Sequence, residues 1–411
     1  MYHDPHLARA AKGDPRPRSA VGHGVGLAGL AGVVAWILVA RHYGMDGPYA
    51  GLVNLLACAL PMVVWSLVVD RVHRRDSTGI RWDAVKPWRE TLDISLTKIA
   101  GLWTTWIGIA ALYLTVRFYW IGNWAFAMWC LLHAAPVLVV ASVPYVLWID
   151  RRLEAPRDGA GHMRAWGVKA FFLPFMLAIV PPGFGQFVRT PLAEALASPV
   201  ALSGWLIDFM FTVDVAFACV GYMLTMRPLD SHIRSANPYA GAWMAALICY
   251  PPFILMEAGG PLDYHPGTAD WRYWLDGHPW ALAVLGAALV ALTAVYAWST
   301  VAFGLRFSNL THRGVMTHGP YAWSRHPAYL SKNLYWWLAT LPVLSTGSLV
   351  DGARATAILG LVSGVYYWRA RTEERHLSAD PDYRAYHAWM ERNGPIPRLF
   401  TRAAGRSGQK R

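Results

Sequence analysis

Long apolar runs separated by shorter polar segments extend along the chain from about residue 23 to residue 368. A helix needs about 20 apolar residues to cross a bilayer, and windows of that length predict ten membrane-spanning helices. They lie at about residues 23–41, 51–69, 99–116, 123–148, 166–182, 204–226, 239–256, 279–305, 328–346 and 350–368. The runs are continuous and do not alternate with period two, which favours helices over a barrel. The pattern therefore predicts an all-α integral membrane protein.

The composition agrees with this class. Of 411 residues, 55% are hydrophobic and only 15% are charged, and the 22 Trp and 19 Tyr gather where apolar runs meet polar ones. The four cysteines, at positions 58, 130, 219 and 249, lie inside apolar runs with no ligand spacing, so they predict neither disulfides nor a zinc site. His312, His318 and His326 also lack metal-ligand spacing, and we expect no metal.

The net charge of +12 is distributed unevenly between the two sides of the predicted bundle. If the N-terminus is cytoplasmic, only Arg41, Arg117, Arg189, Arg272 and Arg354 fall on the other side, where the loop at 257–278 is acidic. This asymmetry follows the positive-inside rule and predicts that both termini are cytoplasmic, in an inner or plasma membrane. The charge orients the protein and gives no reason to expect a nucleic-acid partner.

The same pattern divides the chain into four parts. Residues 1–22 form a cytoplasmic N-terminal segment, and 23–278 hold about seven helices of unrecognised type. Residues 279–402 hold about three helices, the last two forming a hairpin, followed by a cytosolic helical tail. Residues 403–411 are predicted to be a disordered basic tail.

The stretch THGPYAWSRHPAYLSKNLYWWL, residues 317–338, places a polar, cationic turn directly before an apolar run. Pro327 disfavours helical geometry at His326 and suits a first helical turn, so a helix is expected to begin there. The N–H groups of that helix end, together with Arg325, could bind an anion. The alternative interpretation is a capped span with an interfacial Arg-His-Tyr anchor.

A second polar stretch, RARTEERHL at residues 369–377, follows the last apolar run. Arg369 and Glu373 are four residues apart and share a helix face, and Glu374 lies beside them. Tyr383 and Tyr386 follow a few residues later. The alternative for this stretch is a solvated helix with salt bridges along its surface.

Together, GPYxxxRHPxY and RxxxEExxL…YxxY resemble the isoprenylcysteine carboxyl methyltransferase and phospholipid methyltransferase superfamily over about residues 290–400. The resemblance implies S-adenosylmethionine as the methyl donor, bound between the motifs at the cytosolic side, and a lipid or lipidated acceptor. It implies that Arg369, Glu373 and Glu374 are catalytic, with Arg325 suiting the donor's carboxylate and the two glutamates its positive groups. The implied cofactor-binding residues are Gly319, Pro320, Tyr321, Arg325, His326, Pro327, Tyr329, Glu373, Glu374 and Tyr386.

Three polar residues outside these motifs are candidates for binding the acceptor. Asp214 lies in the sixth run, where a carboxylate is costly and must be paired, protonated or hydrated. His232 and Arg234 lie in a short loop on the predicted cytoplasmic side. Structural roles are the alternative for all three.

Two other functions remain open at this point. Membrane sterol reductases, which use NADPH, also place an Arg-His…Tyr turn and a Tyr-rich tail near the end of a ten-span chain. A transporter or receptor could instead use Asp208 and Asp214 to line a pathway.

Overall fold

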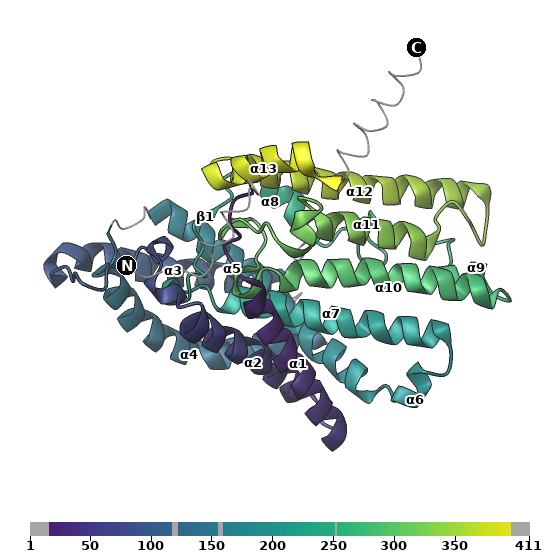
Figure 1. Cartoon of the computed structure of the whole chain (residues 1–411), viewed down its shortest axis with the longest axis horizontal. Helices are drawn as coiled ribbons and strands as arrows, with labels where there is room; N and C mark the ends of the chain where they lie inside the picture. Colours follow the sequence, from purple (N-terminus) through teal and green to yellow (C-terminus); the bar gives the residue numbers. More distant parts are fainter. Residues whose placement is uncertain (1–15, 117–121, 155–158, 251–252, 396–411) are drawn as a thin grey trace, which may run out of the picture.

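The structure is a computed structural model and describes residues 16–116, 122–154, 159–250 and 253–395. The predicted basic tail at 403–411 lies outside these ranges. Helices account for most of the described chain (Figure 1). The α-helices are α1 (His23–Tyr43), α2 (Pro48–Val64), α3 (Trp88–Val116), α4 (Asn123–Asp150), α5 (Gly159–Arg189), α6 (Leu192–Ala195), α7 (Pro199–Met223), α8 (Ala240–Leu247), α9 (Trp271–Trp274), α10 (Pro279–Val301), α11 (Pro327–Thr340), α12 (Leu349–Leu377) and α13 (Pro381–Asn393). Two strands, β1 (Ser235–Ala236) and β2 (Thr311–His312), pair antiparallel.

Eight helices of the described chain are long and apolar enough to cross a membrane: α1, α2 with its continuation to Val69, α3, α4, α5, α7, α10 and α12. The molecule is therefore a multi-pass membrane protein, but the expected count of ten is not confirmed. The seventh predicted span contains only the eight-residue α8, and the ninth contains α11, which has 14 residues. At 1.5 Å per residue α11 is about 20 Å long, less than the hydrocarbon core of about 30 Å.

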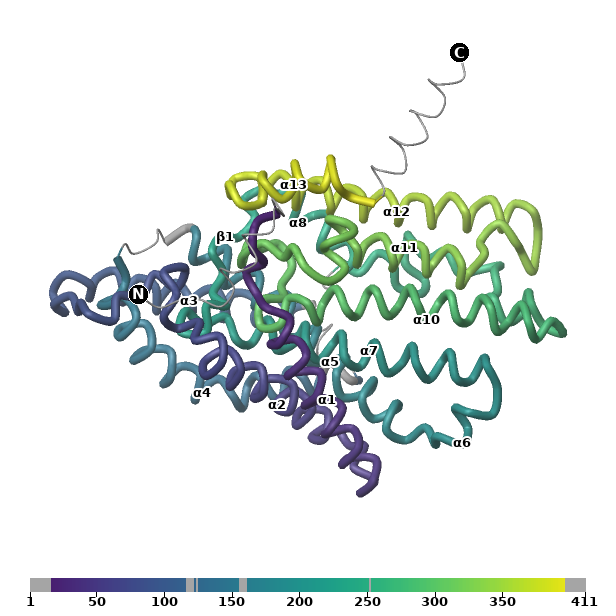
Figure 2. Tube along the Cα trace, in the orientation of Figure 1, coloured from purple at the N-terminus to yellow at the C-terminus, as the bar shows by residue number. Residues whose placement is uncertain are grey.

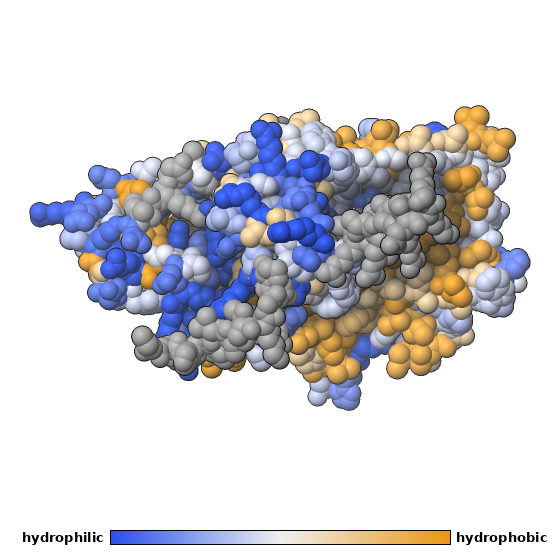
Figure 3. Space-filling view, turned by 45° about the horizontal axis from the view of Figure 1, so that its top comes forward, coloured by the Kyte–Doolittle hydropathy of each residue, from blue (hydrophilic) through white to orange (hydrophobic). Residues whose placement is uncertain are grey.

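Helices α1, α2, α5, α7 and α10 pack together around the main apolar core (Figure 2). Phe172, Phe184 and Phe217 are completely buried there. Helices α3 and α4 project to one side and bury much less of their surface, and Lys98 of α3 forms a buried ion pair with Asp150 of α4 at 2.6 Å. On the face shown in Figure 3, apolar surface gathers over the part that holds the ends of α10–α12 farthest from α13, whereas the opposite part of this face is largely hydrophilic.

Between α8 and α9 the chain passes along the bundle mostly in turns and bends. At its start, the ring of Tyr250 lies 5.4 Å from the guanidinium of Arg369, near the end of α12. Farther on, Gly267 accepts backbone and side-chain hydrogen bonds from the loop that joins α11 to α12, at 3.1 Å each. The described parts of residues 248–270 therefore connect the two ends of the bundle without a long helix.

A cluster of buried polar groups fixes the loops on the α13 side of the bundle. Arg306 forms an ion pair with Asp230 at 2.6 Å, and Arg313 donates hydrogen bonds to the carbonyls of Gly221, Leu305 and Phe307 at 2.7–2.8 Å. Burial lowers the pKa of Arg306 to about 10, and the nearby Asp230 opposes this effect, so the side chain stays cationic at neutral pH. These bonds attach the segment before α11 to the end of α7.

Candidate active site

The turn before α11 has the geometry that its residues require. Gly319 has φ +59°, a conformation that favours glycine, and a Cβ there would lie 3.2 Å from the indole nitrogen of Trp298. Pro320 is buried, and Pro327 is the first residue of α11, as the sequence predicts. His326 is the N-cap residue, and its backbone N–H donates to the Ser324 hydroxyl at 3.2 Å.

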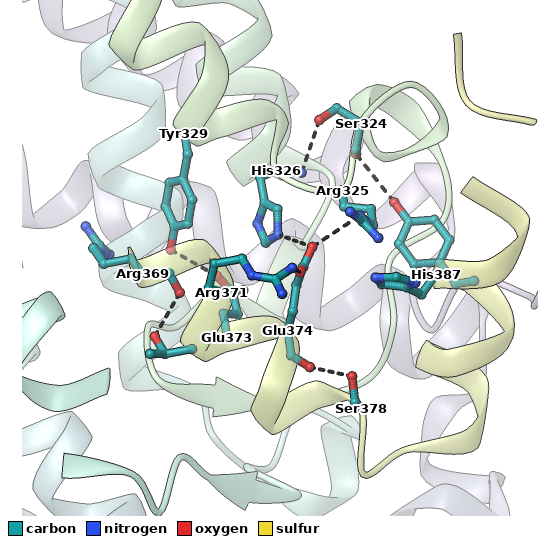
Figure 4. A network of polar contacts seen from close by, with 12 residues as sticks. Ser324, Arg325, His326, Tyr329, Arg369, Arg371, Glu373, Glu374, Ser378 and His387 are labelled. Atoms are coloured by element: carbon teal, nitrogen blue, oxygen red, sulfur yellow. Dashed lines mark hydrogen bonds and ion pairs between the residues drawn. The ribbon is translucent and has the colours of Figure 1, made fainter. Parts of the chain in front are cut away.

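Glu374 joins the two motifs (Figure 4). Its carboxylate lies 3.1 Å from Nε2 of His326 and 3.2 Å from Nε of Arg325, both in the turn before α11. Arg371, one turn away on α12, donates to its other oxygen at 2.9 Å. Three basic side chains therefore already surround Glu374, and it holds the end of α12 against the start of α11.

Glu373 has a different environment. The Tyr329 hydroxyl donates to its carboxylate at 3.0 Å, and the Tyr329 ring lies parallel to the imidazole of His326, with centroids 5.6 Å apart. Glu373 also lines a cavity, which Glu374 does not. The two adjacent carboxylates thus differ: Glu374 is engaged in ion pairs, whereas Glu373 is open to a ligand.

Arg369 lies one helical turn before Glu373 and is only 5% exposed. Its guanidinium lies 5.0 Å from the ring centroids of Tyr329 and Tyr366, and Nη2 donates to the side-chain oxygen of Asn309 at 3.1 Å. Nη1 has no hydrogen-bond partner among the described residues, and neither has the amide nitrogen of Asn309. No carboxylate of the described chain forms an ion pair with Arg369. Because burying an unpaired charge is costly, this geometry indicates an anionic ligand.

The two motifs enclose a narrow cavity of about 940 Å³ of empty space, counting its open mouth. The predicted residues Tyr321, Arg325, His326, Tyr329, Arg369 and Glu373 line it. Polar residues that the motif pattern did not single out also line it: Asn237, Asn309, Tyr250, Tyr296, Thr300, Lys332, Thr372 and His376.

Tyr386 supports the cavity from outside. Its hydroxyl donates to the carbonyl of Tyr321 at 2.7 Å, and burial raises the pKa of this phenol well above its usual range, so it stays a neutral donor. Tyr386 thus braces the turn before α11 and does not line the cavity.

The three candidate acceptor residues lie outside the cavity lining. Asp214 is buried in α7 and accepts a hydrogen bond from Thr300, whose side chain lies between it and the cavity. His232 is buried, and Arg234 donates its backbone N–H to His312. The loop that carries them instead contributes Asn237, whose amide donates to the carbonyl of Thr372 at 3.3 Å. Asn237 lies three residues after Arg234, and the sequence pattern did not single it out.

Within the described ranges no group of three His, Cys, Asp or Glu side chains could hold a metal ion.

Comparison with known proteins agrees with this geometry. Residues 279–379, about a quarter of the chain, match the model of the isoprenylcysteine carboxyl methyltransferase (ICMT) family. The match covers α10, α11 and most of the residues that line the cavity, and it confirms the resemblance seen in the two motifs. The match suggests a membrane methyltransferase and does not favour the reductase or transporter alternatives. No curated protein and no solved structure gave a match.

Proposed function

We propose that this protein uses S-adenosylmethionine to methylate a lipid or lipidated acceptor, on oxygen or nitrogen, at the cytoplasmic side of the membrane. The observation that carries the proposal is the buried Arg369, which lines the cavity and whose Nη1 has no hydrogen-bond acceptor in the described chain. The family match supports methyl transfer as the reaction.

The residues of the cavity fit the donor. Bound there, S-adenosylmethionine supplies an electrophilic methyl group on a sulfonium sulfur. Arg369 would bind the donor's carboxylate with Nη1, while Asn309 holds Nη2 in place. Glu373, whose carboxylate accepts a hydrogen bond from the Tyr329 hydroxyl at 3.0 Å, would bind the ammonium group. The tyrosine rings offer faces for the cationic and aromatic parts.

The remaining motif residues position these groups. Glu374 holds Arg325 and His326 at the mouth of α11, so its removal would displace both. Methyl transfer is an in-line displacement, which depends on alignment and on exclusion of water. The buried aromatic lining of the cavity supports both requirements.

The site is proposed to face the cytoplasm because basic residues concentrate at its end of the bundle. The opposite end carries the acidic loop with Glu257, Asp263, Asp270 and Asp276. The positive-inside rule places the basic end in the cytoplasm.

Calorimetry on the purified full-length protein tests the donor assignment. We expect S-adenosylhomocysteine to bind and NADPH not to bind. The substitution Glu373→Gln should weaken binding by roughly tenfold or more, since it removes a charge-assisted contact. Arg375→Met is the matched control, because Arg375 is exposed on the same helix and stacks on Tyr239 outside the cavity. Binding of NADPH alone would contradict the proposal.

A further inference from the structure

A second, wider cavity lies along α11 beyond the donor cavity. It holds about 1,460 Å³ of empty space, counting its open mouth, and Tyr264, Trp336 and Thr340 are among its walls. Its rim includes Glu257, His265 and Asp270, from the segment between α8 and α9. This rim lies near the α11–α12 loop, at the end of the bundle away from α13.

The two cavities are neighbours and share part of their lining. Lys332 and Tyr366 line both of them, and Lys332 lies less than two helical turns after Pro327 at the start of α11. From Lys332 to Thr340 the second cavity follows α11 for about 12 Å. A molecule in the second cavity would therefore contact two side chains that also line the donor cavity.

The backbone beside this cavity is unusual for a membrane protein. Residues 248–250 and 253–270 lie in turns and bends, yet they pass between the two ends of the helical bundle. Irregular backbone at membrane depth is tolerated where it is buried in protein or lines a water-filled cavity. Ile254, Met256 and Tyr264 of this segment line the second cavity. A hydrated chamber would therefore explain why the backbone of this segment is irregular.

Lys332 gives the inner end of the chamber a positive charge. Its ammonium lies 5.2 Å from the ring centroid of Trp336, 5.3 Å from that of Tyr296 and 5.9 Å from that of Tyr366. Within the described ranges no carboxylate forms an ion pair with it, although Asp214 is near enough to interact electrostatically. Aromatic rings stabilise the ammonium but leave its N–H groups without strong acceptors. An anionic group arriving through the chamber would supply them.

We propose that the second cavity is the acceptor chamber, that it opens at the end of the bundle opposite the donor site, and that Lys332 binds the anionic group of an amphiphilic acceptor. The aromatic and aliphatic walls would hold its apolar body. This inference rests on the proposed function. It adds that donor and acceptor enter from opposite ends and that the acceptor carries a carboxylate or phosphate.

The route is tested with Cys249, which lines the chamber. Of the other cysteines, Cys58 and Cys219 are buried and Cys130 is partly exposed. The full chain with Cys130→Ala is reconstituted in sealed vesicles, and a membrane-impermeant cationic methanethiosulfonate is added outside. A cleavable C-terminal tag reports the orientation of each population. The matched control carries Cys130→Ala with Cys249→Ala.

We expect Cys249 to react only in molecules whose C-terminus is inside the vesicle. Labelling confined to molecules with the C-terminus outside, equal labelling of both populations, or no labelling above the control would overturn the proposed route.

The acceptor class is tested by protection of Cys249 with three amphiphiles of equal chain length: palmitate, palmitoyl lysophosphatidate and hexadecyltrimethylammonium. We expect the anions to slow labelling roughly tenfold or more relative to the cation, since charge-assisted bonds to Lys332 hold them. The anion that slows labelling more shows whether the acceptor carries a carboxylate or a phosphate. Lys332→Met should abolish the preference, and Lys332→Arg should restore it. Equal protection by all three, or protection by the cation alone, would overturn the anionic assignment.

Calorimetry with S-adenosylhomocysteine separates the two hypotheses. Binding of S-adenosylhomocysteine without selective protection of Cys249 would support the proposed function and contradict this inference. Selective protection of Cys249 without binding of S-adenosylhomocysteine would support the acceptor chamber and contradict the proposed donor.

Discussion

Two groups of buried cations in this protein differ in how their hydrogen-bonding capacity is used. Arg306 and Arg313 are 3% and 2% exposed, and their guanidinium groups are surrounded by Asp230 and by backbone carbonyls at the end of α7. Arg369 is equally buried at 5% exposure, but Nη1 has no acceptor in the described chain and lies at a cavity. Burial and charge are the same in both groups.

The difference separates a structural cation from a ligand-binding one. A buried guanidinium with all its donors satisfied stabilises the fold, and its removal leaves several carbonyls without partners. A buried guanidinium with a spare donor is kept at a cost to stability, and its charge is fully compensated only when an anion binds. The following substitutions test this distinction, from the largest expected effect to the smallest.

Arg313→Met should have the largest effect on stability. The substitution leaves the carbonyls of Gly221, Leu305 and Phe307 without a donor, at about 1–3 kcal/mol for each buried group. We expect a loss of monodisperse protein on size-exclusion chromatography, or a strongly lowered Tm. A Tm within about 2 °C of that of the parent protein would show that Arg313 does not stabilise the fold.

Arg369→Met should have the opposite profile. It removes the charge-assisted bond to the donor's carboxylate, worth about 1.5–3 kcal/mol, so affinity for S-adenosylhomocysteine should fall roughly tenfold to a hundredfold. The Tm of the ligand-free protein should stay the same or rise, because a buried charge that forms no ion pair in the described chain is lost. Calorimetry and thermal unfolding on the same sample measure both quantities. A large drop in Tm with affinity unchanged would make Arg369 structural.

His312 predicts a moderate dependence of stability on pH. Burial lowers its pKa to about 4, although Asp380 at 3.3 Å opposes this shift. Between pH 6.5 and 4 the unfolded chain therefore binds more protons than the folded one, so stability falls as the pH is lowered through this range. From pH 7.5 to pH 5 the loss should reach up to about 2 kcal/mol. Thermal unfolding of His312→Gln should show a shallower slope than the parent; an unchanged slope would assign the dependence to other groups.

Glu391→Gln should have the smallest effect. Its carboxylate lies 3.9 Å from Arg325, but the side chain is 61% exposed, and exposed ion pairs contribute about 0–1 kcal/mol. Both Tm and affinity for S-adenosylhomocysteine should stay near those of the parent protein. A strong loss of affinity would mean that α13 takes a direct part in the site.

Much of the site was predictable because its signals are local. Proline chemistry predicted the start of α11 at Pro327, and helical spacing predicted that Arg369 and Glu373 share a face. The separate roles of Glu373 and Glu374 were not predictable, since they depend on which side of α12 meets the turn before α11. Asn309 and Lys332 were missed for the same reason, because each matters only through its neighbours across the cavity.

The membrane part shows a similar limit. Of the first eight apolar runs, seven coincide with long helices of the structure, α1 to α5, α7 and α10. The exception is the run at 239–256, where hydropathy predicted a span and the structure has the short α8 followed by turns. Hydropathy reports burial away from water and does not distinguish a lipid-facing helix from irregular backbone packed against a cavity. The tertiary structure makes that distinction here.

By itself, the sequence determined the class of protein, the two motifs and the helices that carry them. Run length, proline geometry and helical periodicity act over a few residues and need no partner. Only the tertiary structure decided that Arg369 keeps a spare donor, that Glu374 is already engaged in ion pairs, and that Lys332 lines two cavities. These properties depend on packing between residues far apart in the chain, because that packing determines which hydrogen-bonding groups and charges have partners.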